Sequence, residues 1–288
     1  MTMLNLNNKF GPWAIITGAS SGIGQGFANA LAKQGFNLVL IARRENMLKD
    51  ISDGLTLKYG TQSQVLALDL SDPLALQKIK ESTKNLDIGL LISNAGGGQL
   101  GRFDAIKTED LNALNQLNMS SHLELSHLLM SKLDKQHRPG GILFVSSTAG
   151  LQGIPYIANY AANKAYLTSL AEGLNSELKA KKIHVTALLP GPTSTPGFHD
   201  NAEINFDAMP MKPMSVDAVV EEGLKALAKN QPLHIAGRIN RVMAWMGKYL
   251  LSRKVNTKMW GSLLSKSLVS KVSVPTSAAP KPLSTPST

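Results

Sequence analysis

Cysteine is absent from this 288-residue sequence, which excludes disulfide bonds and thiolate chemistry. The six histidines show no metal-ligand spacing, so we expect no metal site, and we interpret His122 and His127 as packing or surface residues. Every apolar run is too short to span a membrane. The N-terminus also lacks the charged region of a signal peptide, and together these absences predict a cytoplasmic protein.

Acidic residues are missing from the C-terminal part of the sequence. From Arg238 to the end there are nine Lys and Arg and no Asp or Glu. Residues 1–237 hold the other 21 basic residues and all 20 acidic ones, so the net charge of +10 belongs to the tail. With 43% hydrophobic residues, a chain of this length can bury the core of one large domain or of two small ones.

A tyrosine and a lysine stand four residues apart after a strand-like run. Residues 142–145 have the apolar character of a buried strand, and Pro155 and Asn159 predict a turn and a helix start. In that helix Tyr160 and Lys164 share one face. An ammonium beside a phenol lowers the pKa of the phenol, which suits acid–base catalysis near neutral pH. The alternative is an exposed helical pair without a function.

Three glycines follow another strand-like run, residues 13–16, at positions Gly18, Gly22 and Gly24. A helical pattern comes next and stops at Gly35. Strand, glycine turn and helix form the context in which a helix N-terminus binds a pyrophosphate; a merely structural turn is the alternative. The residues expected to contact a nucleotide cofactor here are Gly18, Ser20, Ser21, Gly22, Ile23 and Gly24.

The second predicted strand, residues 36–42, ends in Arg43 and Arg44. An NAD-binding protein places an acidic residue near this point to hold the ribose 2′-hydroxyl. No acid closes this strand, and arginine offers a bidentate grip on a 2′-phosphate, so we expect NADP(H) rather than NAD(H). Two solvated arginines at a helix start are the alternative.

Two further strands end in small or acidic residues. The third, residues 64–70, closes with Asp69. The alternative is that Asp69 caps a helix that starts near Pro73. The fourth, residues 88–92, runs into Ser93-Asn94-Ala95-Gly96. Small residues are needed where a backbone passes close to a cofactor.

Together these motifs resemble the short-chain dehydrogenase/reductase superfamily. The glycine loop has its Thr-Gly-x-x-x-Gly-x-Gly spacing from Thr17, and residues 93–96 match its Asn-Asn-Ala-Gly with serine first. Ser147 precedes Tyr160 by the 13 residues seen in the superfamily. The resemblance covers residues 13–195, in the branch of single-domain ketoreductases and hydroxysteroid-type dehydrogenases. It implies an α/β fold: a Rossmann-type, doubly wound, seven-stranded parallel sheet with helices on both faces.

The resemblance also implies catalytic roles. Ser147 would hydrogen-bond the substrate oxygen, with Ser146 as the alternative, and Tyr160 would give or take the proton. Lys164 would lower the pKa of the tyrosine and hold the nicotinamide ribose, and Asn118 would hold a proton-relay water. The remaining cofactor contacts it implies are Asp69, Leu70, Asn94, Ala95, Gly96, Tyr160, Lys164, Pro190, Gly191 and Thr193.

After the catalytic helix we expect a sixth strand over residues 183–189 and a seventh over residues 233–236. Residues 194–213 lack a regular pattern, which favours a functional lid. The other predicted helices span residues 108–133 and 215–229. Residues that would give the lid an apolar wall, and so favour a hydrophobic substrate, are Phe198, Phe206, Met209, Met211 and Met214.

Residues 1–237 therefore read as the catalytic domain, and residues 238–274 as a basic, amphipathic helical extension. Such helices either contact a membrane surface, here through residues 238–271, or pack on the enzyme or a partner subunit. No nucleic-acid reading motif accompanies the charge. Residues 275–288 are rich in Pro, Ser and Thr and predict disorder. The resemblance implies a homodimer or homotetramer, which the extra tail leaves open.

The function expected from these features is an NADPH-dependent carbonyl reductase, or the reverse alcohol dehydrogenase, acting on a small hydrophobic ketone, aldehyde or secondary alcohol. A second hypothesis is a nucleotide-binding regulatory protein without turnover, against which the intact serine, tyrosine and lysine argue. A third is a peripheral membrane reductase of lipid or fatty-acyl metabolism, which the tail would deliver to its substrate.

Overall fold

A seven-stranded parallel sheet forms the centre of the computed structural model, which describes residues 5–199 and 212–267. The strand order is β3-β2-β1-β4-β5-β6-β7, so the chain winds outward from β1 in one direction and then from β4 in the other. This confirms the expected doubly wound fold. The strands are β1 Trp13–Thr17, β2 Asn37–Ala42, β3 Ser63–Ala67, β4 Ile88–Ser93, β5 Gly140–Val145, β6 Ile183–Leu189 and β7 Leu233–Ile235.

The strands are short aliphatic runs because both faces of the sheet are covered. Every residue of β4 and β5 is buried. Successive side chains point to opposite faces, so Ala14 and Ile16 of β1 join one hydrophobic cluster while Ile15 joins the other. Strand β3 ends earlier than expected, at Ala67, because the chain turns at Asp69.

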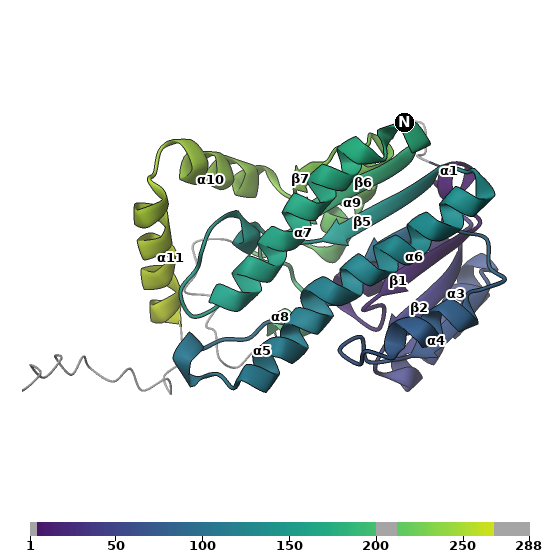
Figure 1. Ribbon diagram of the computed structural model, residues 1–288, viewed down its shortest axis with the longest axis horizontal. Helices are drawn as coiled ribbons and strands as arrows, with labels where there is room; N and C mark the ends of the chain where they lie inside the picture. Colours follow the sequence, from purple (N-terminus) through teal and green to yellow (C-terminus); the bar gives the residue numbers. More distant parts are fainter. Residues whose placement is uncertain (1–4, 200–211, 268–288) are drawn as a thin grey trace, which may run out of the picture.

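Helices α2, α3 and α9 cover one face of the sheet, and α4, α6 and α7 cover the other. Figure 1 shows α6 and α7 crossing the sheet side by side, with α10 and α11 at the end of the molecule away from α1. The helices are α1 Asn7–Phe10, α2 Gly22–Ala32, α3 Glu45–Tyr59, α4 Ala75–Ser82, α5 Thr108–Asn115, α6 Ser121–Gln136, α7 Ala158–Glu177, α8 Pro196–His199, α9 Val216–Ala228, α10 Arg238–Tyr249 and α11 Arg253–Ser267.

The helix expected over residues 108–133 is not continuous. A π-helical turn, Gln116–Ser120, separates α5 from α6 and contains Asn118. Such turns insert an extra residue into a helix and are frequent at functional sites. The helix expected over residues 215–229 is α9, and the hydroxyl of Ser215 caps it by accepting a hydrogen bond from the amide of Ala218.

Two helices follow the sheet, as the pattern after Gly237 predicts, and we call α10 and α11 together the C-terminal extension. Across residues 5–199 and 212–267, no helix combines the length and apolarity needed to cross a membrane. The expected disordered tail, residues 275–288, lies outside the described residues and stays a prediction, as do most of the lid and its Phe206, Met209 and Met211.

Candidate active site

A cavity of about 780 Å³ opens at the carboxyl ends of the strands, where β1 and β4 lie side by side. In a doubly wound sheet this is the point where the chain direction reverses and ligands bind. Most of the site residues predicted from the sequence line the cavity, whereas Gly24 and Asn118 do not. The lining residues include Gly18, Ser20, Ser21, Gly22, Ile23, Arg43, Arg44, Asp69, Leu70, Asn94, Ala95, Gly96, Ser147, Tyr160, Lys164, Pro190, Gly191 and Thr193.

The glycine loop is clamped to the end of β4. Gly18 has a φ of +65°, and a Cβ there would lie 2.7 Å from the side-chain nitrogen of Asn94. That nitrogen donates a hydrogen bond to the carbonyl of Thr17 at 2.9 Å, and the Thr17 hydroxyl accepts from the amides of Asn94 and Ala95. The side chain of Asn94 therefore holds the glycine loop in place, and Asn94 also lines the cavity.

Helix α2 begins at Gly22, and both Gly22 and Ile23 of its first turn line the cavity. The side chain of Ser21, the capping residue, makes no hydrogen bond to the first amides of the helix, and the first turn contains no acidic residue. Amides left uncapped at a helix N-terminus, together with the positive end of the helix dipole, are what a pyrophosphate binds. The residues present fit a dinucleotide at this end of the cavity.

Both arginines after β2 also line the cavity. The Nη2 atom of Arg44 donates hydrogen bonds to the hydroxyls of Ser20 and Ser21, each at 2.9 Å, so this guanidinium also braces the glycine loop. Asp69 accepts hydrogen bonds from the amide and hydroxyl of Ser71 at 2.9 and 2.7 Å. These bonds, and the charge of Arg43, lower the pKa of Asp69. The carboxylate of Asp69 thus closes a local turn with Ser71 and also lines the cavity.

Ser147, Tyr160 and Lys164 come together at the other end of the cavity. The hydroxyls of Ser147 and Tyr160 are hydrogen-bonded, and the Nζ atom of Lys164 lies 5.7 Å from the centre of the Tyr160 ring. The hydroxyl of Ser146 instead donates to the carbonyl of Lys164 at 2.7 Å, inside the protein. The geometry thus favours Ser147 over Ser146 as the residue that meets a substrate.

The pKa values in this cluster differ from the expectation. Burial raises the pKa of Tyr160, and the hydrogen bond from Ser147 opposes this only in part, so the phenol of the chain alone is not made more acidic. Lys164 is only 4% exposed, and burial lowers its pKa to about 8. Its Nζ donates to the carbonyl of Val145 at 2.8 Å, which turns part of its charge away from the phenol. The phenol of Tyr160 therefore stays protonated at neutral pH.

Asn118 is fully buried beside the same end of the cavity. Its side-chain nitrogen donates to the carbonyl of Gly97 at 2.9 Å, and its side-chain oxygen accepts from the amide of Gly97 at 3.0 Å. A water relay through this residue would therefore use its main-chain carbonyl, which lies in the π-helical turn. A Cβ added to Gly96 would lie 3.2 Å from the Asn118 oxygen and 3.3 Å from the Lys164 nitrogen, so the absence of a side chain keeps this corner open.

His122 lies just behind the site, fully buried, as packing predicts, whereas His127 is exposed. The Nε2–H of His122 donates to the carbonyl of Ala95 at 2.8 Å, so the neutral His122 ring accepts at Nδ1 from the hydroxyl of Ser93 at 2.7 Å. Burial, and to a lesser degree the charge of Lys164, lowers the pKa of His122 to about 3. Ser93, which stands where the superfamily motif has its first asparagine, therefore has a hydrogen-bond partner in His122. Within the described residues, no group of three or more His, Asp or Glu is placed to hold a metal.

Helix α11 forms the far wall of the cavity, which sequence reasoning missed. Trp260, Leu263 and Leu264 line it, although the sequence shows them only as an amphipathic stripe. Leu264 and Trp260 pack with Ile154 of the loop before α7. A Cβ on Gly261 would lie 2.8 Å from a ring carbon of Pro155, so the α11 backbone rests directly on that loop.

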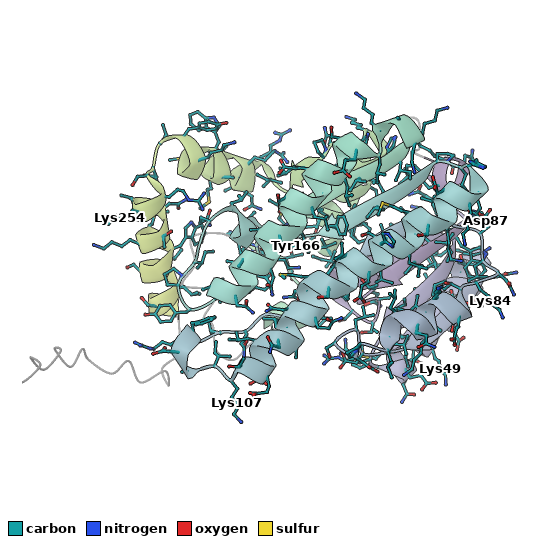
Figure 2. All side chains as sticks on the ribbon, in the orientation of Figure 1. Lys49, Lys84, Asp87, Lys107, Tyr166 and Lys254 are labelled. Atoms are coloured by element: carbon teal, nitrogen blue, oxygen red, sulfur yellow. The ribbon has the colours of Figure 1, made fainter. Side chains whose placement is uncertain are left out.

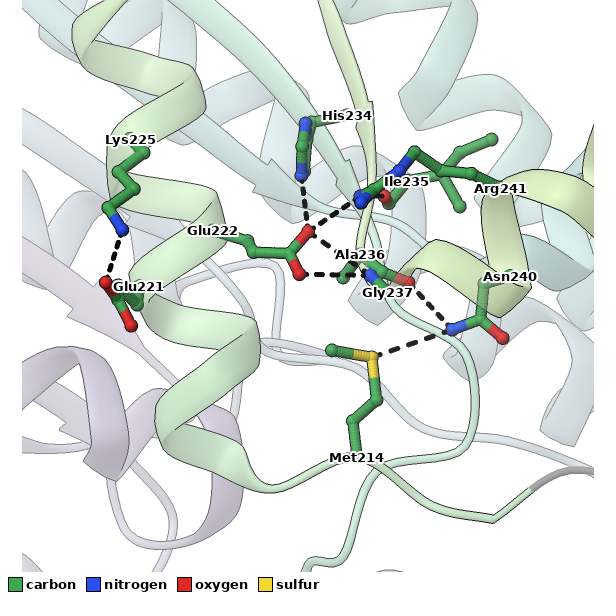
Figure 3. A network of polar contacts seen from close by, with 10 residues as sticks. All are labelled: Met214, Glu221, Glu222, Lys225, His234, Ile235, Ala236, Gly237, Asn240 and Arg241. Atoms are coloured by element: carbon green, nitrogen blue, oxygen red, sulfur yellow. Dashed lines mark hydrogen bonds and ion pairs between the residues drawn. The ribbon is translucent and has the colours of Figure 1, made fainter.

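Glu222 of α9 anchors the start of the C-terminal extension, as Figure 3 shows. Its carboxylate accepts from Nε2 of His234 at 2.8 Å, from Arg241 at 2.9 Å and from the amide of Gly237. Burial alone would raise the pKa of Glu222, but these hydrogen bonds outweigh it and lower the pKa. Arg241 also donates to the carbonyl of Ile235 at 2.8 Å, so one carboxylate ties α10 to β7.

The loop after β6 is held by the same region. A Cβ on Gly191 would lie 2.6 Å from the side-chain nitrogen of Asn240, so α10 supports the Pro190–Thr193 turn directly. Contrary to the expectation, Met214 does not line the cavity. It pairs with Thr193 along the backbone and packs on the core, where its sulfur accepts from Asn240 at 3.6 Å.

Comparisons with known proteins agree with this geometry. A family model described as short chain dehydrogenase matches residues 12–204. A 7beta-hydroxysteroid dehydrogenase of Mediterraneibacter gnavus is 30% identical over 240 residues, which cover 83% of this chain and 90% of that enzyme. A solved structure reported for 7beta-hydroxysteroid dehydrogenase stereoselectivity has a TM-score of 0.82 at 27% identity, covering 89% of this chain and 99% of that one.

A short-chain dehydrogenase from Sphingobium yanoikuyae in complex with NADPH has a TM-score of 0.74 at 30% identity, covering 83% of this chain and 93% of that one. Sheet order, cavity position and these matches agree with each other. The chain belongs to the short-chain dehydrogenase/reductase superfamily, in its branch of ketoreductases and hydroxysteroid dehydrogenase-like oxidoreductases.

Proposed function

We propose that this oxidoreductase is an NADPH-dependent carbonyl reductase acting on a bulky, hydrophobic ketone or aldehyde. The observation that carries the proposal is the position of Ser147, Tyr160 and Lys164 at one end of a single cavity whose other end holds Arg43 and Arg44. The first group supplies acid–base chemistry, and the arginines supply a site for a 2′-phosphate.

The preference for NADPH rests on charge. Two guanidinium groups line the cavity beyond β2, where an NAD-binding protein would place a carboxylate. The nearest cavity-lining acid, Asp69, is occupied by Ser71. The NADPH-bound Sphingobium relative is consistent with this preference.

The residues at the catalytic end suit reduction. NADPH, when bound, supplies the hydride, which no side chain can provide. The Ser147 hydroxyl would donate a hydrogen bond to the substrate carbonyl oxygen. The Tyr160 phenol, whose raised pKa keeps it protonated, would give that oxygen its proton. Lys164 would hold the ribose and restore the tyrosine proton through water at the Asn118 carbonyl.

The substrate end of the cavity is apolar. Trp260, Leu263 and Leu264 of α11 line it together with Ile154 and Ile157. Burying an apolar side chain or ligand group against such a wall stabilises the complex by roughly 25 cal/mol per Å². A lipophilic carbonyl compound of steroid size fits this chemistry, as the name of the hydroxysteroid dehydrogenase relatives also suggests.

The direct test is a screen of purified enzyme for NADPH oxidation at 340 nm with steroid ketones, 3-oxoacyl thioesters, aromatic ketones and short polar ketones. We expect turnover with lipophilic carbonyls, little with short polar ones, and a much lower rate with NADH. Tight NADPH binding without turnover on any member of the panel would instead favour a nucleotide-binding regulatory protein.

A further inference from the structure

Helix α10 carries its apolar side chains on the outside of the molecule. Ile239, Tyr249 and Leu250 are 71%, 62% and 61% exposed. On the opposite side of the helix Asn240 is buried, and Gly247 packs against Asn256 of α11. Of the roles left open for this amphipathic stripe, packing on the enzyme itself is therefore not observed, which leaves a membrane surface or a partner subunit.

This exposure is concentrated in one place. Of the 13 large apolar side chains that are exposed among the described residues, eight lie between Ile239 and Met259, so the C-terminal extension differs from the rest of the surface. Exposed apolar patches of this kind mark interaction sites. The eight are Ile239, Val242, Trp245, Met246, Tyr249, Leu250, Val255 and Met259.

Only positive charges accompany these side chains. From Arg238 to the end of the chain there is no acidic residue. Arg241 is paired with Glu222, but Arg238, Lys248, Arg253, Lys254 and Lys258 are exposed. Figure 2 shows Lys254 projecting from α11 away from the rest of the protein. A second copy placed face to face would bring like charges together, whereas an anionic surface complements them.

The aromatic residues fit a lipid surface better than a protein core. The rings of Trp245 and Tyr249 lie 5.8 Å apart, one turn along α10, and both side chains are more than half exposed. Indole and phenol groups favour the boundary between lipid headgroups and acyl chains, because they are apolar in body and polar at one end. A helix with basic and aromatic residues lies in the plane of such a boundary.

We propose that the C-terminal extension is a docking surface for membranes that contain anionic phospholipids. The apolar stripe of α10 enters the headgroup region, and Lys248, Arg253, Lys254 and Lys258 bind the phosphates around it. Helix α11 then joins two surfaces, because Lys254, Val255 and Met259 face outward while Trp260 and Leu264 face the cavity. A substrate dissolved in the bilayer would meet the enzyme at the wall of its own site; this consequence, unlike the docking, rests on the proposed function.

The test uses the full chain, sedimented with vesicles of phosphatidylcholine alone or with about a third phosphatidylglycerol. We expect binding to the anionic vesicles only. The double change Lys254→Gln and Lys258→Gln should weaken it about 25-fold, or roughly fivefold per lysine, as expected for a basic residue near an anionic surface. Its control, Lys80→Gln with Lys135→Gln on α4 and α6, removes the same charge elsewhere and should bind like the wild type.

A second pair of variants tests the apolar stripe. Trp245→Ser with Tyr249→Ser should abolish vesicle binding, whereas Leu57→Ser, at a residue 91% exposed on α3, should not. Circular dichroism and NADPH binding check that each variant is folded.

Equal binding to neutral vesicles, or equal losses in the control variants, would overturn the proposal. The proposal would also fail if the wild type bound neither kind of vesicle and formed a dimer that the Trp245→Ser, Tyr249→Ser variant did not form. A second copy of the chain would then cover this face. Sedimentation does not depend on turnover, so the docking and the proposed activity can fail separately.

Discussion

The ammonium of Lys164 lies 5.7 Å from the centre of the Tyr160 ring and donates its hydrogen bond to the carbonyl of Val145, not to the phenol. Burial dominates both groups: it raises the pKa of the tyrosine and lowers the pKa of the lysine to about 8. Burial thus shifts both groups toward their neutral forms, although Lys164, with a pKa of about 8, is still mostly protonated at neutral pH. This arrangement has consequences for the pH dependence of the reaction.

Reduction and oxidation should respond differently to pH. Reduction requires a protonated Tyr160, which its raised pKa maintains, so kcat/KM for reduction should stay flat from about pH 6 to about pH 7, before Lys164 loses its proton near pH 8. Oxidation of the product alcohol requires the phenolate and should rise about tenfold per pH unit over the same range. Initial rates in both directions would check this, and a parallel rise in both would argue that another group transfers the proton.

Replacing Arg43 with Ala should change the choice of cofactor. A charge-assisted hydrogen bond to a phosphate contributes roughly 1.5–3 kcal/mol, so the Kd for NADPH should rise about tenfold to hundredfold while that for NADH changes little. We choose Arg43 because Arg44 also braces the glycine loop. Lys49→Ala, which removes a cation on α3 outside the cavity lining, is the control. Equal losses for the two nucleotides would contradict the NADPH preference.

Glu222→Gln should loosen the far wall of the cavity without touching it. The change removes the carboxylate that holds Arg241 and His234, so α10 and α11 lose their common anchor. We expect a severalfold higher KM for a bulky ketone and a smaller rise in the Kd for NADPH, because α10 also supports the Pro190–Thr193 turn. Glu221→Gln, one residue earlier, breaks only an exposed pair with Lys225 and should behave like the wild type (Figure 3). If the two variants have the same KM, the anchor has no role in substrate binding.

His122 should make the protein sensitive to acid. The unfolded chain binds a proton on this residue near pH 6.5, whereas the folded protein resists protonation down to about pH 3. The unfolded state therefore binds more protons in this window, and stability that is full above pH 6.5 is lost at about 1.4 kcal/mol per pH unit as the pH falls.

His122→Gln retains a donor and an acceptor for Ala95 and Ser93 but has no titrating group. Urea unfolding at several pH values between 4.5 and 6.5 should give a shallower slope of stability against pH for the variant than for the wild type. Identical slopes would show that His122 does not carry this acid sensitivity.

The sequence predicts the sheet well because parallel strands are buried on both faces and read as short aliphatic runs. Strand β6 agrees with the prediction at both ends, and β3 ends early only because Asp69 makes a local turn with Ser71. The cavity residues could be predicted because Gly18, Tyr160 and Lys164 occur in local patterns whose spacing has a physical meaning. Local sequence patterns thus identify most of the residues that line the cavity.

What the sequence does not reveal depends on contacts between distant segments. The amphipathic pattern of α11 shows that Trp260 and Leu264 share a face, but not that this face closes the cavity on Pro155. Glu222, His234 and Arg241 are unremarkable in the sequence and meet only because α9, β7 and α10 converge. The pKa of Tyr160 also depends on burial, which the distance between two residues along a helix does not determine.

The most direct test of the proposed activity is the change Tyr160→Phe, measured as single-turnover NADPH oxidation with a lipophilic ketone. The variant loses only the hydroxyl that donates the proton, so reduction should fall by a factor of at least about 10² while the Kd for NADPH stays within about twofold of the wild type. A variant that binds NADPH and reduces the ketone as fast as the wild type would contradict the account, because some other group would then supply the proton.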